Sequence, residues 1–581
     1  MNDEKILQYG EFNSNQIFFI QRWSELLHSY THSRYSIRYL NVNQALIELD
    51  GICKGMLKEE VKRNKDHLKI TFKEAYSILE KDKIFKNRAP SYYKILNNTL
   101  QQSPDPTKNS GLYSVIYQLE YVMRYVEKYY LDWVIDYLES LLFNDEEKLV
   151  EVEETLKILA SELVGKGWSV NSLWELGKAF YKKKFSEEKR FSHLFDEFRR
   201  EEEEYIFLFT IKDKVSNDAR TQLKHLDIDF IESKSILQQY EDYNLQNISH
   251  DKEYIRSTHK CQDRQSGVNK AWEEISRKVN IINFYGFQSL NVDTSPIILM
   301  SSEKKYYRNI RVKVIEEQKK FQAPEPMMFN VRTQLKRGDP SINRKIENLF
   351  EFTKISEDAL APQSTFLNLW IATESFVQSK NYDGGIENVK NVISASSTKN
   401  YIYGLVKNFV EDCGRCSIVG DINGKSIYFG KLEPKEMLEY FMDEGKAKLL
   451  LKAISTKNTL LVHRFLELKD ILKNNRKCSD LLENHKNKID QHIHRLYRIR
   501  NSIVHSGEME YKVNLFTKHL HEYIQQLMSI VFHRLNEEPD SSLEDIFTQT
   551  KDSVQATIEV LKQSKEMDKD SYYDLLLNGA F

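Results

Sequence analysis

Apolar residues recur at spacings of three and four along most of this chain, and this periodicity predicts a mainly helical protein. The clearest case is YSVIYQLEYVMRYVEKYYLDWVIDYLESLL at 113–142, which indicates one amphipathic helix or a pair of helices. The helical pattern extends to about residue 204. We therefore expect a helical N-terminal region at 1–204.

The pattern changes after Glu204, where short β-rich runs alternate with helical stretches. The runs YIFLFTIK, DIDFIE and SPIILM are typical of strands, and VNKAWEEISRKVNIINF is typical of a helix. This alternation predicts a small α/β or α+β domain at 205–325, a candidate sensor of a ligand or partner. The proline-containing FQAPEPMMF at 321–329 is predicted to be a linker.

Helical periodicity returns at about residue 335 and predicts a helical bundle at 335–537. The remaining residues are more polar and include a helical run, SVQATIEVLKQ, so we expect a polar helical tail at 538–581. The predicted fold class is mainly α, with a helical N-terminal region, a small central α/β domain and a C-terminal bundle.

Composition limits the function classes. The 84 basic and 86 acidic side chains give a net charge of −2, which excludes a strongly basic nucleic-acid binder but not a local basic patch. The five cysteines are sparse and odd in number, which favours a reducing compartment. The polar start and the short apolar runs predict neither a signal peptide nor a membrane span. We therefore expect a cytoplasmic protein.

The predicted helix at 489–505 carries a charge among its apolar positions. At about 100° per residue, Arg500 falls in the middle of a stripe formed by Ile489, Ile493, Leu496, Ile503 and Val504. A guanidinium stays charged in a protein. An arginine among apolar side chains therefore needs a carboxylate, a phosphate or water.

A second predicted helix, TFLNLWIATESFV at 365–377, also carries a charged residue, an acid, among the apolar positions of one face. Glu374 shares one face with Leu367, Trp370 and Ile371. The simplest interpretation pairs Glu374 with Arg500 between two packed helices. From these two residues alone, a structural ion pair and a functional pair both remain open.

His505 adds a group that titrates near neutral pH. It lies in the last turn before Gly507, a natural helix end where the dipole favours a histidine. A histidine can take the proton of an RNA 2′-hydroxyl, and a forked guanidinium can hold two phosphate oxygens. Asn501 would fix the phosphate or orient the histidine. Arg500 and His505 therefore form the minimum set of groups for cleaving RNA without a metal.

The motif R-N-S-I-V-H at 500–505 resembles the signature of the HEPN superfamily. The flanking LYRI and SG, and FLNLWIATESF at 366–376, resemble its Apea-like subgroup. The resemblance covers about 335–535 and implies a bundle of about four or five helices. Members are often metal-independent endoribonucleases of toxin and antiviral defence systems, active as dimers whose motifs meet in one cleft. Carried over, Arg500 and His505 would be catalytic, Asn501 supportive, and Glu374 structural or polarising.

One point of geometry stays open on this helix. Residues five apart diverge by about 140°, so Arg500 and His505 do not share a face, whereas Arg498 and His505 do. Arg498 is therefore the second candidate for the catalytic arginine. Tyr497, Asn501 and His505 share a face at spacings of four and are expected to line a cleft.

Two further residues of this helix, His494 and Arg495, are candidates for binding substrate. Together with His492 they would form a positive rim for RNA phosphates. The alternative is an exposed polar face of the helix.

Two other motifs are set aside. Cys413 and Cys416 form a single CxxC, and a structural zinc site needs four ligands. GDINGKS at 420–426 is one residue short of a phosphate-binding loop and is better explained as a glycine-rich hairpin. We therefore expect no metal and no cofactor.

The sequence thus supports two hypotheses. The first is a metal-independent endoribonuclease that cleaves RNA by 2′-hydroxyl attack, a toxin or antiviral defence effector that forms a homodimer through residues 335–537. Residues 1–320 would receive a regulatory ligand or partner. The alternative is a non-catalytic dimerisation or RNA-binding module in which Arg500 and Glu374 form a structural pair.

Overall fold

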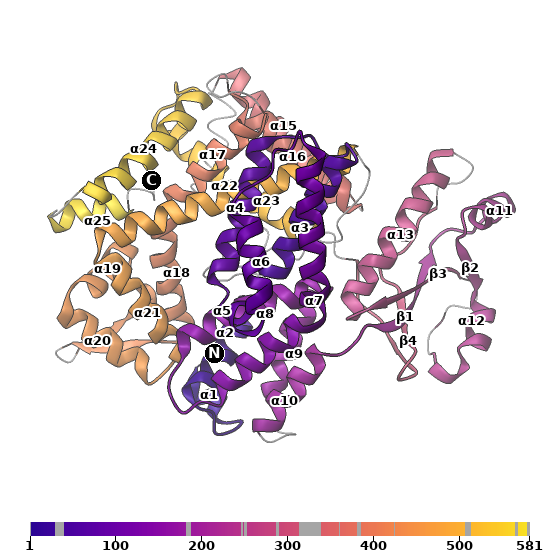
Figure 1. The fold of residues 1–581 in the computed structure, drawn as a ribbon, viewed down its shortest axis with the longest axis horizontal. Coiled ribbons are helices and arrows are strands. Elements are labelled where there is room, and N and C mark those ends of the chain that lie inside the picture. Colours follow the sequence, from indigo (N-terminus) through magenta and orange to yellow (C-terminus); the bar gives the residue numbers. More distant parts are fainter. Residues whose placement is uncertain are drawn as a thin grey trace.

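The computed structural model of the chain describes residues 2–28, 40–181, 187–245, 248, 252–285, 290–312, 339–359, 361–379, 385–422, 425–505, 513–563 and 568–577. The architecture is mainly helical with one small central sheet, as the periodicity predicted. Figure 1 shows the N-terminal helices lying beside the C-terminal helices, with the sheet projecting to one side.

The N-terminal region folds around one hydrophobic core. Its helices are α1 (Asp3–Leu7), α2 (Ser14–Leu26), α3 (Val42–Leu57), α4 (Lys65–Lys81), α5 (Lys83–Arg88), α6 (Pro90–Leu100), α7 (Asn109–Leu142), α8 (Leu149–Gly165), α9 (Val170–Gly177) and α10 (Glu187–Phe198), with a short 3-10 turn η1 (Lys178–Tyr181). The run at 113–142 forms one helix, α7, rather than a pair. Asn41 and Asn64 cap α3 and α4 by accepting hydrogen bonds from backbone N–H groups of the first turn. These caps explain where the two helices begin.

The central sheet is antiparallel, with the strand order β2-β3-β1-β4-β5. Its strands are β1 (Glu203–Ile211), β2 (Asp229–Glu232), β3 (Glu253–Cys261), β4 (Ile297–Met300) and β5 (Lys305–Tyr307), and its helices are α11 (Asn217–His225), α12 (Ser233–Gln239), η2 (Glu241–Tyr243) and α13 (Arg264–Tyr285). The β1-α11-β2 and β3-α13-β4 units interleave as a split βαβ arrangement. Helix α13 covers one face, where Phe207 and Phe209 are buried, and α12 covers the other. The sheet is therefore of the α+β kind; the predicted linker at 321–329 lies outside the described residues.

The region predicted as one bundle at 335–537 contains two cores. The first core is built by α15 (Pro340–Asp358), α16 (Pro362–Val377), α17 (Gly385–Lys399) and α23 (Val513–Glu537). The second is built by α18 (Tyr401–Arg415), α19 (Pro434–Met442), α20 (Glu444–Ser455) and α21 (Thr459–Leu472). Helix α22 (Asn475–His505) belongs to both, since Cys478 and Leu482 enter the second core and Ile489 and Ile493 the first.

The predicted polar tail at 538–581 does not stand apart from the bundle. Helices α24 (Leu543–Gln563) and α25 (Lys569–Leu577) complete the cores just described. Phe547 is buried in the first core, and Ile558 and Tyr573 are buried in the second. Polar residues cover the outer faces of both helices, which explains the polar composition of this segment.

The predicted hairpin at 420–426 is present as β6 (Val419–Ile422) and β7 (Lys425–Tyr428), followed by a 3-10 turn η3 (Phe429–Lys431). Gly430 of η3 packs directly against Gly414 of α18. A side chain at Gly430 would overlap the Gly414 backbone, so these two glycines allow the hairpin to lie on the helix.

The N-terminal and C-terminal helices are joined by buried contacts. Helix α2 packs on α21, and Leu460 joins the N-terminal core. Arg464 of α21 is buried, and it pairs with Glu25 of α2 and, at 2.7 Å, with Asp412 of α18. In the part of the chain that the structure describes, no helix is long and apolar enough to cross a membrane.

Candidate functional site

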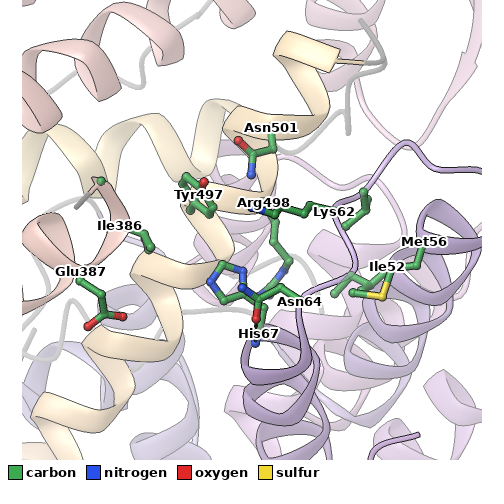
Figure 2. Close-up of a pocket in the computed structure, with 12 residues that line it drawn as sticks. Ile52, Met56, Lys62, Asn64, His67, Ile386, Glu387, Tyr497, Arg498 and Asn501 are labelled. Atoms are coloured by element: carbon green, nitrogen blue, oxygen red, sulfur yellow. Dashed lines mark hydrogen bonds between the residues drawn. The ribbon is translucent and has the colours of Figure 1, made fainter. Parts of the chain in front are cut away.

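The last turns of α22 line a pocket of about 300 Å³ between the N-terminal and C-terminal helices. Tyr497, Arg498 and Asn501 form its α22 wall. The facing walls come from the end of α3, the α3–α4 connection, the start of α4 and the start of α17, through Ile52, Met56, Val61, Lys62, Asn64, His67, Gly385, Ile386 and Glu387. Figure 2 shows Lys62, Asn64 and His67 near Arg498, with Glu387 on another wall.

The α4 wall is fixed by the cap of that helix. The Asn64 Oδ1 accepts hydrogen bonds from the backbone N–H groups of Asp66 and His67 at 2.9 and 3.1 Å. The His67 ring then lies edge-on to Tyr497, with ring centroids 5.7 Å apart, and 4.9 Å from the ring of His494. An imidazole from the N-terminal region therefore faces the predicted motif helix.

Arg498 reaches the pocket while held by a carboxylate of α3. It pairs with Glu48, which also accepts a hydrogen bond from Arg495 Nε at 2.9 Å. Burial raises the pKa of Glu48, but the two guanidinium groups outweigh burial and hold this pKa at about 2. Glu48 is therefore ionised at neutral pH.

Arg495 and His494 do not form the predicted positive rim. Arg495 is 4% exposed and binds Glu48 and, at 2.7 Å, Glu74 of α4; His494 is 2% exposed. Nor do these residues form an exposed polar face, because α3 and α4 cover this side of α22. Both substrate-binding assignments are therefore corrected to buried contacts between helices.

The imidazoles near the pocket are neutral at physiological pH. Burial lowers the pKa of His494 to about 3, with the neighbouring His67, Lys390 and Arg498 acting in the same direction. Burial and Arg498 also lower the pKa of His67. A neutral His67 can accept a hydrogen bond or a proton from a group in the pocket.

Arg500 is not among the residues that line this pocket. It is half-buried, and its Nη1 donates to Asn501 Oδ1 at 3.1 Å. The stripe in which the sequence placed it does not reach the end of α22, since Val504 is 49% exposed. Arg500 therefore lies at the margin of the core, not within it.

Both side chains of the expected ion pair, Arg500 and Glu374, are described by the structure, and they do not pair with each other. Glu374 Oε2 instead accepts a hydrogen bond from Trp370 Nε1 at 3.0 Å, within the same helix. Ile371, which shares the predicted apolar face with Glu374, is exposed. The core side of α16 is formed by Phe366, Leu369 and Phe376, so Glu374 did not require a cationic partner.

His505 is the last residue of α22. Its side chain lies outside the described residues, as does Gly507. Tyr497, Asn501 and His505 were predicted to line a cleft together. The structure places Tyr497 and Asn501 at a pocket.

The pocket contains groups that the sequence did not indicate. Lys62, Asn64 and His67 belong to the N-terminal region, more than four hundred positions before α22. The Asn64 cap was readable as a helix start, but no local pattern connects that start with α22. The pocket offers two cations, two amides, a phenol and a neutral imidazole, together with the Glu387 carboxylate on the α17 wall. The side formed by α22 and the α3–α4 connection is suited to an anion with hydrogen-bonding groups.

The structure offers no evident metal centre within its described part, where no group of three histidine, cysteine or acidic side chains is placed to hold an ion. Cys413 and Cys416 are both buried, free thiols, and burial raises the pKa of each. The CxxC motif is therefore explained by packing in the second C-terminal core.

Comparisons with models of protein families, with curated proteins and with solved structures found no match for this chain. The assignment of a function therefore depends on the pocket and on the residues of α22.

Proposed function

We propose that this protein is a metal-independent endoribonuclease of the HEPN type. The observation that supports the proposal is the pocket where Tyr497, Arg498 and Asn501 meet Lys62 and His67. These three residues of α22 precede the R-N-S-I-V-H motif or lie within it, and Asn501 is one turn before His505.

The proposed reaction is attack of an RNA 2′-oxygen on the adjacent phosphorus. The 2′-oxygen–phosphorus bond forms and the bond to the 5′-oxygen breaks, leaving a 2′,3′-cyclic phosphate and a 5′-hydroxyl. His505 takes the 2′-hydroxyl proton, and the 5′-oxygen gains a proton from a second acid or from water. Arg498 and Lys62 bind the phosphate, and Arg500 stabilises the charge that develops on it.

Asn501 connects the pocket with Arg500 of the motif. Asn501 lines the pocket and accepts a hydrogen bond from Arg500 Nη1. Asn501 would thus link the bound phosphate to the arginine of the motif. In the same proposal Tyr497 provides a surface for a base, and His67 is a second proton acceptor.

The cellular role that follows is a toxin or antiviral defence effector acting in the cytoplasm as a homodimer through the C-terminal helices. A ligand or partner that binds within residues 1–320 would regulate it. The pocket supports this link to the N-terminal region, because α3 and α4 supply several of its walls.

A second candidate function is a non-catalytic module in which α22 is a structural element. The buried pairs of Arg495 and Arg498 with Glu48 and Glu74 favour it, because they tie α22 to the N-terminal region. Such a module would bind RNA or a second copy without cleaving RNA.

RNA cleavage by purified variants tests the proposal. His505→Ala should keep the melting temperature of the parent and lose cleavage by about 100-fold or more, as expected for loss of a general base. His225→Ala, which removes an exposed histidine of α11, is the matched control and should cleave normally. EDTA should leave the rate unchanged. Cleavage by His505→Ala at the parental rate, or a requirement for a divalent metal, would reject the assignment.

A further inference from the structure

Helix α7 presents a row of exposed tyrosines that takes no part in the pocket. Tyr113, Tyr117 and Tyr121 are 51%, 70% and 60% exposed. Their spacing of four places them on one face, about 6 Å apart along the helix axis. Rings that stand this far out of a helix are available for stacking by another molecule.

The row continues into a group of rings shared with α6. The Tyr92 ring lies 5.7 Å from that of Tyr121 and 4.4 Å from that of Tyr125, with which it is stacked. Tyr129 follows, 5.0 Å from Tyr125. These contacts hold the inner rings in place, and with Tyr113 and Tyr117 the rings are distributed along about 16 residues of α7, or roughly 24 Å.

Cations stand beside the rings. Arg124 and Lys128 are exposed at three and seven positions after Tyr121, and Lys128 Nζ lies 4.9 Å from the centre of the Tyr129 ring. Of the nearby carboxylates, Glu120 is paired with Lys54 at 2.7 Å, and Glu127 is exposed. Lys54 is also paired with Asp50 at 2.8 Å, so the charges around the rings balance, and the face combines aromatic surface with the two exposed cations Arg124 and Lys128.

The row begins close to the pocket. Arg63 stands between the pocket residues Lys62 and Asn64, and its Nη1 donates to Asn109 Oδ1 at 2.8 Å, at the first residue of α7. Tyr113 is one turn further along this helix. A polymer lying on the row would therefore extend toward the pocket.

We propose that the tyrosine row of α7, Tyr113, Tyr117 and Tyr121 with Tyr92 and Tyr125, is a binding track for single-stranded RNA. Unpaired bases stack on the tyrosine rings, and Arg124 and Lys128 bind the phosphates. The track rests on the proposed function only for the identity of the polymer, since RNA is the proposed substrate of the pocket. Single strands are favoured over duplex because duplex bases are not free to stack on side chains.

The test measures binding separately from cleavage. The probe is a fluorescein-labelled mixed-sequence RNA with 2′-O-methyl riboses, which has no 2′-hydroxyl to attack the phosphate. Tyr117→Ala/Tyr121→Ala should bind it at least about 10-fold more weakly than the parent, because the variant loses the stacking contacts that two bases make with these rings. Tyr117→Phe/Tyr121→Phe should bind like the parent, since phenylalanine keeps the ring. Tyr428→Ala, which removes an exposed tyrosine of β7, is the matched control.

The salt dependence of RNA binding tests the role of Arg124 and Lys128. Arg124→Gln/Lys128→Gln should reduce the slope of log affinity against log salt by about 1.4, the value for two phosphate contacts on a single strand. Unchanged RNA binding by the alanine double variant would overturn the proposal, as would a loss of self-association without a loss of RNA binding. If RNA binding depends on the tyrosines but the protein does not cleave ordinary RNA, the nuclease assignment is rejected and the proposed binding track is retained.

Discussion

Arg495 of α22 and Glu74 of α4 form an ion pair at 2.7 Å across the junction between the N-terminal and C-terminal helices. The same guanidinium binds Glu48 of α3 through its Nε. An arginine on the motif helix is therefore neutralised by carboxylates of the N-terminal region, not offered to a substrate.

The first prediction concerns this buried arginine. Arg495→Ala should lower the free energy of unfolding by about 3–5 kcal/mol, because it removes a buried guanidinium and leaves the half-buried carboxylates of Glu48 and Glu74 with a lost partner. Denaturant unfolding measures the change. Arg476→Ala, which removes an exposed arginine from the first turn of the same helix, should stay within about 0.5 kcal/mol of the parent. Equal stability of the two variants would contradict the buried cluster.

The second prediction separates stability from activity at Arg500. Arg500→Ala should cost less than about 1 kcal/mol of stability, because the bond described for its side chain is to the adjacent Asn501 and not to a buried carboxylate. RNA cleavage should fall by about 100-fold or more, as for loss of a donor to a developing oxyanion. A strongly destabilised Arg500→Ala would instead support the structural alternative.

The third prediction concerns pH. The pKa of His494 is lowered to about 3 in the folded protein from an ordinary value of 6.5. Below pH 6.5 the unfolded chain binds a proton that the folded chain does not, so the stability present above pH 6.5 is lost as the pH falls toward 3. His494→Gln should therefore reduce the slope of stability against pH by about 1.4 kcal/mol per pH unit between about pH 5.5 and 4.5, where the unfolded histidine is almost fully protonated.

Denaturant unfolding at a series of pH values provides the measurement. His225→Gln, at an exposed position of α11, should retain the parental slope. A parental slope in His494→Gln would show that His494 is not held neutral by burial.

The fourth prediction compares two glycines near the hairpin. Gly430→Ala should destabilise by about 1–3 kcal/mol or more, because its Cβ would overlap the backbone of Gly414. Gly404→Ala, within α18 and with open space at its Cβ, should stabilise by about 0.5–1 kcal/mol. Thermal unfolding of both variants should give shifts of opposite sign, and shifts of the same sign would contradict this packing.

The candidate site was only partly accessible to sequence reasoning. The spacing of Tyr497 and Asn501 was sufficient to place them on one face, and both line the pocket together with Arg498. The pairing of Arg500 with Glu374 was wrong, because the apolar stripes that suggested it end before Val504 and exclude Ile371. The assignment of Arg495 and His494 to a substrate rim was wrong because it treated α22 as a helix with solvent on its polar side.

The sequence by itself determined the local elements: a mainly helical chain, a small sheet after Glu204, a hairpin at 420–426 and one continuous helix through 489–505. Periodicity reports which side of an element is buried, and caps report where it begins. Only the tertiary structure decided what covers each face. The partners of Arg495 lie 447 and 421 positions away, at Glu48 and Glu74. A carboxylate so distant leaves no trace in the pattern around an arginine, because an ion pair depends on distance in space and not on separation along the chain.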